Sequence, residues 1–231
     1  MTELQRAIET YHGLLDDAVA QASQELLAAQ QAKRGLFFGA RPLCTVLRPR
    51  FLTQAQYRSL RRAIAAVMPA FARAHDLALR APNFRAQFML SAWEEQLVSL
   101  PMPYRASSPT ARMDTFFVPQ TNALKFTEYN AETPAGIGYH DALSEIMLGL
   151  PIMHRFERYY EVFPLPGRHH VRHALEQSYH EWGGREPMRI AILDWKEVPT
   201  YSEFVQFQDL SLIHISEPTR LLSISYAVFC L

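Results

Sequence analysis

The sequence predicts an α+β fold: a helical N-terminal region, then a β-hairpin, then the start of a βα unit. Three observations predict it. Aliphatic residues recur at helical spacing through the N-terminal part. Two extended-type runs flank the turn-rich segment Pro119-Gln120-Thr121-Asn122. The apolar run Met188–Trp195, MRIAILDW, is typical of a buried strand.

The helical region is expected to contain three helices. The first runs from Glu3 to about Lys33 with one apolar face, and Gly35 ends it. The second covers Thr53 to Ala81, with Thr53 as a plausible N-cap, and Pro69 should kink or split it. The third covers Asn83 to Val98. A proline-rich stretch then separates this region from the hairpin.

The hairpin strands are predicted at Arg112–Val118 and Leu124–Asn130. Further helices are expected at His140–Leu150 and at Arg168–Trp182, where Gly183 supplies a C-terminal signal. After the apolar strand, the spacing Thr200-x-x-Glu203 predicts a capping box that opens another helix. This pattern is the opening of a βα unit.

Composition narrows the function classes. The chain has 231 residues, 48% of them hydrophobic, and its 23 Lys and Arg balance 23 Asp and Glu. A balanced charge gives no field that attracts a phosphate backbone, so nucleic acid is not an expected partner. The N-terminus lacks a basic start followed by an apolar run, and no segment is apolar enough to predict a membrane span. Cys44 and Cys230 show no paired spacing, and a reducing cytoplasm is the expected location.

Residues 210–231, LSLIHISEPTRLLSISYAVFCL, form a segment of a different kind. They back-translate into what looks like a transposase-type sequencing adapter, with Leu221, Leu222 and Ser223 where the variable sample index would be read. We therefore expect a non-native tail, with the natural protein continuing beyond Asp209. The alternative is a genuine C-terminal strand, since ISYAVFCL is β-branched and aromatic.

The polar residues of the hairpin carry the chemistry. Side chains alternate along a strand, so Arg112 and Asp114 share one face, and Glu128 and Asn130 share one face of the next strand. A five-residue loop would place Asp114 opposite Glu128 and Arg112 opposite Asn130, with Phe116 against Phe126. Two opposed carboxylates repel each other and require a cation.

Two carboxylates and an amide oxygen are hard ligands that suit Mg²⁺, which takes phosphate oxygens at its remaining positions. Arg112 would then stabilise charge during phosphoryl transfer. The alternative is an ordinary solvated hairpin face. A second possible metal pair, His169 and His173, has no nearby carboxylate or thiol to complete it, and a solvated helix face explains it better.

The stretch RMDTFFVPQTNALKFTEYNAETPAGIGY resembles the R-x-D … E-Y-N-A-(D/E)-(T/S)-P motif of glutathionylspermidine synthetase-like proteins and related circularly permuted ATP-grasp families. The later IAILDWKEVPTYSEF looks like the first strand and turn of the Rossmann-like pre-grasp region of those families. From the first to the last, the motifs span residues 112–204, about half of residues 1–209. The loop P-A-G-I-G departs from the glutathionylspermidine enzymes, which makes glutathione a doubtful substrate.

The resemblance implies an incomplete ATP-grasp fold and a ligase that uses ATP and Mg²⁺ to join a small-molecule or peptide carboxylate to an amine through an acyl phosphate. It implies that Arg112 contacts the transferred phosphate and that Asp114, Glu128 and Asn130 bind magnesium. It divides the chain into 1–187 (helical region plus metal-ligand hairpin), 188–209 (truncated start of the pre-ATP-grasp βα domain) and 210–231 (adapter-derived tail).

In such enzymes the nucleotide-gripping lysines would lie beyond Asp209, so no nucleotide-binding residue is expected in this chain, and the fragment itself is expected to be inactive. The rival hypothesis is a non-catalytic binding or assembly module without a metal site.

Overall fold

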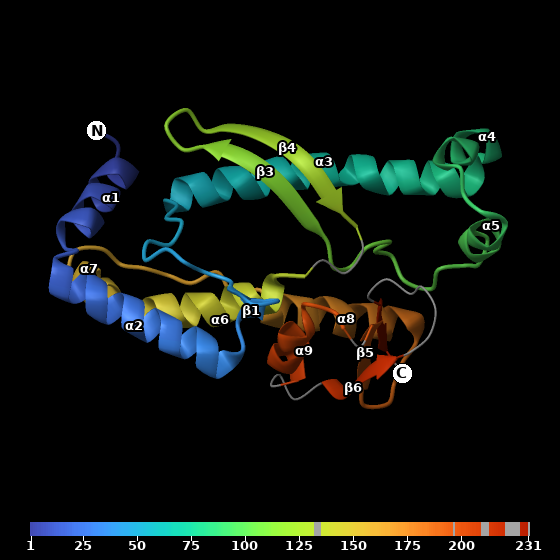
Figure 1. Ribbon diagram of the computed structural model, residues 1–231. Helices are drawn as coiled ribbons and strands as arrows, with labels where there is room; N and C mark the ends of the chain where they lie inside the picture. Colours follow the sequence, from blue (N-terminus) through green and yellow to red (C-terminus); the bar gives the residue numbers. More distant parts are fainter. Residues whose placement is uncertain (132–134, 196, 209–212, 220–226, 231) are drawn as a thin grey trace.

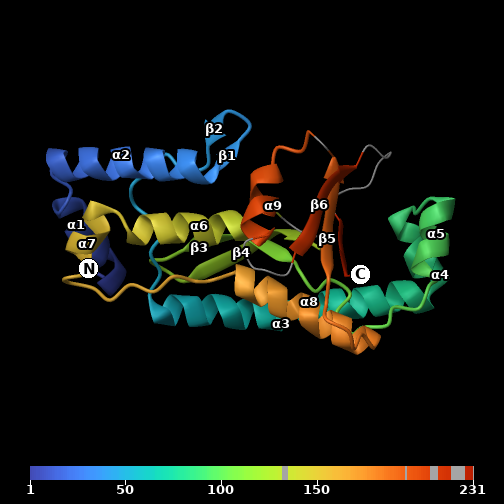
Figure 2. The same cartoon turned by 90° about the horizontal axis from the view of Figure 1, so that it is seen from below.

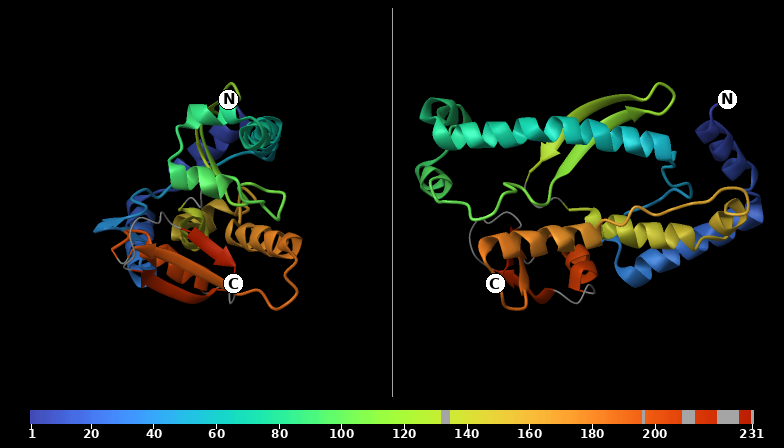
Figure 3. Two further views of the ribbon diagram at one scale, coloured as in Figure 1. Left: turned by 90° about the vertical axis from the view of Figure 1, so that its right-hand side faces the viewer. Right: turned by 180° about the vertical axis from the view of Figure 1, so that it is seen from behind.

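The computed structural model describes residues 1–131, 135–195, 197–208, 213–219 and 227–230, without the side chains of Trp195 and of the last two ranges. The fold is mixed α and β, as the sequence predicted. Figure 1 shows two layers, one with the long helix α3 and the hairpin β3–β4, the other with α2, α6, α8, α9 and the strand β5. The end-on and rear views keep the same two layers (Figure 3).

The N-terminal segment forms two helices, α1 (Glu3–Gly13) and α2 (Asp17–Arg34), so the prediction of one continuous helix was wrong. The break has a local cause. Asp16 adopts an extended conformation, and its side chain accepts a hydrogen bond from the backbone N–H of Val19, which starts a second helix. Gly35, at φ 63°, ends α2 as predicted, and a short strand pair, β1 (Phe37–Phe38) and β2 (Arg41–Pro42), follows.

The helix α3 (Gln54–Arg80) begins at the predicted N-cap, where Thr53 and Gln56 form a capping box. The helix runs through Pro69 without splitting, so of the two expected effects of this proline the split does not occur. The predicted helix over 83–98 was also wrong. That segment comprises α4 (Pro82–Arg85), a 3₁₀ turn (Ala86–Phe88) and α5 (Ala92–Val98), because Met89 takes a left-handed conformation at φ 51° and Ser91 caps a new helix.

The hairpin consists of β3 (Arg112–Val118) and β4 (Ala123–Asn130), antiparallel and nearly at the predicted bounds. It packs on α3 (Figure 1). The rings of Phe71 and Tyr129 stack with centroids 4.1 Å apart, and the Gln56 side-chain amide donates to the carbonyl oxygen of Pro119 at 3.1 Å. These contacts fix the hairpin from both its turn and its open end.

The other layer contains α6 (Ile137–Leu148), α7 (Pro151–Phe156) and α8 (Arg168–Trp182), and α6 lies among α2, α7, α8 and α9 (Figure 2). The bounds of α8 agree with the prediction, whereas the expected helix over 140–150 starts three residues earlier and ends at Leu148. The main core joins α1, α2, α6 and α7, and Tyr11 and Phe156 meet there edge to face at 5.2 Å.

The last part begins with β5 (Ile190–Trp195) and α9 (Tyr201–Gln208), the strand and helix of the predicted βα opening. Two strands from the 210–231 segment flank β5: β6 (Ile213–Thr219) is parallel to it and β7 (Ala227–Cys230) is antiparallel. Any extended segment can satisfy the hydrogen-bonding groups of a strand edge, so this pairing does not test the adapter origin, which stays a prediction. Within the described ranges, every helix is too short or too polar to cross a bilayer.

Candidate functional site

The open end of the hairpin brings the four predicted residues together. Arg112 pairs with Asn130, and Asp114 pairs with Glu128, in the predicted register. The connection is one residue shorter than expected, because Val118 pairs with Ala123 and only Pro119–Asn122 lie between them. A register shift between Asp114 and Thr115 adds one residue on β4 and so restores the predicted partners at the open end. The two carboxylates therefore stand on neighbouring strands at directly opposed positions.

Arg112 provides the positive charge beside these carboxylates. Its Nε donates to Asp114 Oδ1 at 2.8 Å, and Asn130 Nδ2 lies 3.5 Å from the same oxygen. The Arg112 and Asp114 side chains are 45% and 37% exposed, so solvent screens the ion pair and its contribution to stability is small. Asp114 is accordingly positioned by Arg112 while remaining accessible to an ion from solvent.

The predicted pairing of the next residues was wrong, because the strands form a bulge there. The register shifts between Asp114 and Thr115, so Thr115 pairs with Phe126, and Phe116, expected against Phe126, pairs with Lys125. The Thr127 hydroxyl donates to the backbone oxygen of Asp114 at 3.0 Å across the shift. The bulge interrupts the ladder directly beside Asp114, a common way for a strand to re-aim a side chain near a site.

A second contact fixes the far end of the Arg112 guanidinium. Its Nη1 donates to the carbonyl oxygen of Ala135 at 2.7 Å, in the connection between β4 and α6. Glu132, Thr133 and Pro134, which complete the E-Y-N-A-E-T-P motif, lie outside the described residues. Arg112 is thus held by a carboxylate on one side and by a backbone carbonyl on the other.

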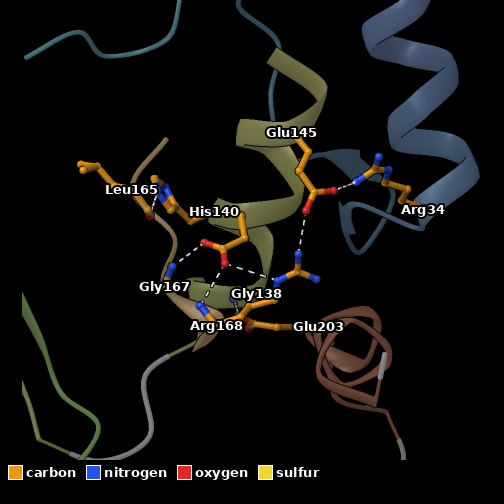
Figure 4. Close-up of polar contacts among 9 residues, drawn as sticks. Arg34, Gly138, His140, Glu145, Leu165, Gly167, Arg168 and Glu203 are labelled. Carbon is orange, nitrogen blue, oxygen red and sulfur yellow. Dashed lines mark hydrogen bonds and ion pairs between the residues drawn. The ribbon is translucent and has the colours of Figure 1, made fainter. Parts of the chain in front are cut away.

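Sequence reasoning missed the part that Glu203 plays. It was expected to cap its own helix, α9, but its carboxylate instead accepts hydrogen bonds from the N-terminus of α6. The N–H of Gly136 donates to the two carboxylate oxygens at 2.8 Å and 2.9 Å. The N–H of Gly138 donates to one of them at 2.8 Å (Figure 4). A glycine N-cap has no side chain to accept these donors, so a carboxylate from another element satisfies them.

Glu203 is 1% exposed, and this burial raises the pKa of its carboxyl group. The N–H groups of Gly136, Gly138 and Tyr139 and the charge of Arg112 act in the opposite direction and lower that pKa. Gly136 and Gly138 are each required for a different reason. Gly136 has φ 114°, a turn conformation, whereas a Cβ on Gly138 would lie 3.0 Å from Glu203 Cγ. The close approach at Gly138 is therefore to a carboxylate of the same chain.

A parallel arrangement caps α8. Asp141, on α6, accepts from the N–H of Gly167 at 2.7 Å and of Arg168 at 2.9 Å, and from Arg168 Nε at 3.3 Å. Arg168 also binds Glu145 at 2.7 Å, and Glu145 binds Arg34 at 2.6 Å (Figure 4). This network joins α2, α6 and α8 below the hairpin.

The donor chemistry of the hairpin end fits a hard divalent cation. Asp114 and Glu128 are carboxylates, and the amide of Asn130 lies beside Asp114. Among the described residues, no group of three or more His, Cys, Asp and Glu could hold a metal ion, and the hairpin end offers two carboxylates and an amide. The histidines of α8, His169 and His173 among them, are exposed, as predicted for a solvated face.

Comparison of the chain with protein-family models, with curated proteins and with solved structures finds no match.

Proposed function

We propose that this chain carries the magnesium-ligand part of an ATP-dependent carboxylate–amine ligase, which forms an amide through an acyl phosphate. The observation that supports it best is the register of the hairpin, in which Asp114 faces Glu128 and Arg112 faces Asn130. The motif around these residues resembles that of permuted ATP-grasp ligases. Register and motif are independent, because a motif match in sequence does not require its residues to meet in space.

Asp114, Glu128 and Asn130 would hold the ion through oxygen atoms. Asn130 directs its amide nitrogen towards Asp114, and a half-turn about the last side-chain bond would present its oxygen instead. Mg²⁺ at this position supplies positive charge to the phosphate oxygens of ATP. Asp114 can keep one oxygen on Arg112, because that contact uses Oδ1 only.

Arg112 would bind the phosphate that is transferred. A guanidinium has five donors, of which Nε and Nη1 are used by Asp114 and Ala135, so donors remain for phosphate oxygens. A cation fixed in advance stabilises the charge that develops on the transferred group without having to reorganise. The substrates would be ATP, a small-molecule or peptide carboxylate and an amine, and the compartment would be the cytoplasm.

Metal binding by the chain itself tests this proposal. Free Mn²⁺, which replaces Mg²⁺ at oxygen sites, is counted by electron paramagnetic resonance as protein is added. We expect the parent chain to bind Mn²⁺ at the hairpin and Asp114→Asn to weaken that binding about tenfold or more, since a charged ligand is lost.

The matched control is Asp76→Asn, on α3, which removes an exposed carboxylate paired with Arg80 of the same helix. This variant should bind as the parent does. Equal Mn²⁺ binding by the parent and by Asp114→Asn would refute the metal site and favour a non-catalytic module.

A further inference from the structure

We propose that Glu203 is a positioning residue for Arg112, acting through the peptide group that joins Ala135 to Gly136. This inference rests on the proposed function, because it assigns a role next to the residue that would bind the phosphate. The two side chains come from elements far apart in the sequence, β3 and α9. A single backbone peptide connects them.

The connection is short and rigid. The N–H of Gly136 donates to both carboxylate oxygens of Glu203, and the C=O of Ala135 accepts from Arg112 Nη1 at 2.7 Å. This N–H and this C=O belong to the same peptide bond. A peptide unit is planar, so fixing its N–H end also fixes the direction in which its carbonyl points.

Charge strengthens the arrangement. A peptide dipole has its positive end at N–H and its negative end at C=O, and here an anion lies at the first end and a cation at the second. Hydrogen bonds in such a series polarise one another, and burial of Glu203 places part of the series in a medium of low dielectric constant. The charge of Arg112 also favours the ionised form of Glu203 and lowers its pKa.

The competing interpretation is that Glu203 only caps α6. Asp141 offers the comparison, because it also is a buried carboxylate that accepts two backbone N–H groups at a helix N-terminus. The groups that Asp141 binds belong to Gly167 and Arg168, and none of them leads to the hairpin. A variant of Asp141 therefore reproduces the loss of a cap without disturbing the Ala135 carbonyl.

The test is nuclear magnetic resonance of arginine side chains in the 231-residue chain labelled with ¹⁵N, with Arg112 assigned by its disappearance in Arg112→Lys. In the parent, the bond from Nη1 to Ala135 should slow rotation about Nε–Cζ, so the two Nη groups give separate signals at low temperature. In Glu203→Ala we expect this rotation to become about tenfold faster or more, as the loss of one charge-assisted hydrogen bond would produce. Asp141→Asn should leave the Arg112 signals as in the parent.

A second variant covers the case in which Glu203→Ala does not fold. Gly138→Ala retains the carboxylate but adds a Cβ 3.0 Å from Glu203 Cγ, which should displace it and free Arg112 in the same way. Unchanged Arg112 signals in these variants, together with faster hydrogen exchange at Gly136 and Gly138, would show that Glu203 is only a cap. Averaged Nη signals in the parent would also overturn the inference. Neither result bears on Mn²⁺ binding, so the proposed function fails or survives separately.

Discussion

Replacement of Asp141 by Ala should destabilise the chain strongly, because this side chain is the cap of α8. The carboxyl group is 6% exposed and accepts two backbone N–H groups and the Arg168 guanidinium. Each buried donor left without a partner costs at least ~1 kcal/mol. Arg168 keeps Glu145 as a partner, so its charge is not left unpaired. We therefore expect a loss of about 2–3 kcal/mol in the free energy of unfolding.

Urea denaturation followed by far-ultraviolet circular dichroism measures this loss. With a dependence of ~2–3 kcal/mol per molar urea, the midpoint should fall by about 1 M. The control is Glu145→Ala, which removes a half-exposed partner of the same arginine and should cost less than ~1 kcal/mol. A midpoint for Asp141→Ala within the error of the parent would refute the view that a carboxylate from α6 sustains the start of α8.

Three further results are expected from the helices and the core. Burial raises the pKa of Tyr11 to about 12, so between pH 10 and 12 this phenol ionises in the unfolded chain before it does in the folded chain. The free energy of unfolding of the parent should therefore fall over this pH range, and that of Tyr11→Phe should fall less. Gly35→Ala, at φ 63°, should cost about 1 kcal/mol in urea, and Gly13→Ala, which has open space and no positive φ, should not destabilise. The hydrogen bond from the Val19 N–H lowers the pKa of Asp16, so the ionised Asp16 side chain stabilises the fold above pH 3.8 and this stabilisation is lost in acid. The urea midpoint of Asp16→Asn should therefore depend less on pH below that value than the midpoint of the parent.

Local signals predicted much of the fold. The start of α3 is marked by the capping box of Thr53 and Gln56. The ends of α2 and α8 are marked by the left-handed conformations of Gly35 and Gly183. These signals depend only on nearby residues. The partners at the open end of the hairpin were also predicted, but from a five-residue loop; the loop has four residues, and the register shift beside Asp114 makes up the difference. The division at Asp16 was missed, because the helical spacing of aliphatic residues continues across Asp16 while the helical conformation of the backbone is interrupted there.

The site was predicted only where its residues lie on neighbouring strands. Arg112, Asp114, Glu128 and Asn130 meet as expected, but the bulge beside Asp114 depends on a tertiary choice that the alternation of residues does not encode. Glu203 reaches Gly136 across 67 residues of sequence. Its capping-box spacing indicated a local role, and only the packing of α9 against α6 shows where its carboxylate goes.

If Asp114, Glu128 and Asn130 hold one divalent ion beside Arg112, paramagnetic broadening by Mn²⁺ in backbone amide spectra will locate that ion. We predict that substoichiometric Mn²⁺ first broadens the signals of residues 112–115 and 127–131, on both strands together. Signals of α2, which lies in the other layer, should stay sharp. Broadening centred instead on the histidines of α8, with the hairpin signals unchanged, would contradict it.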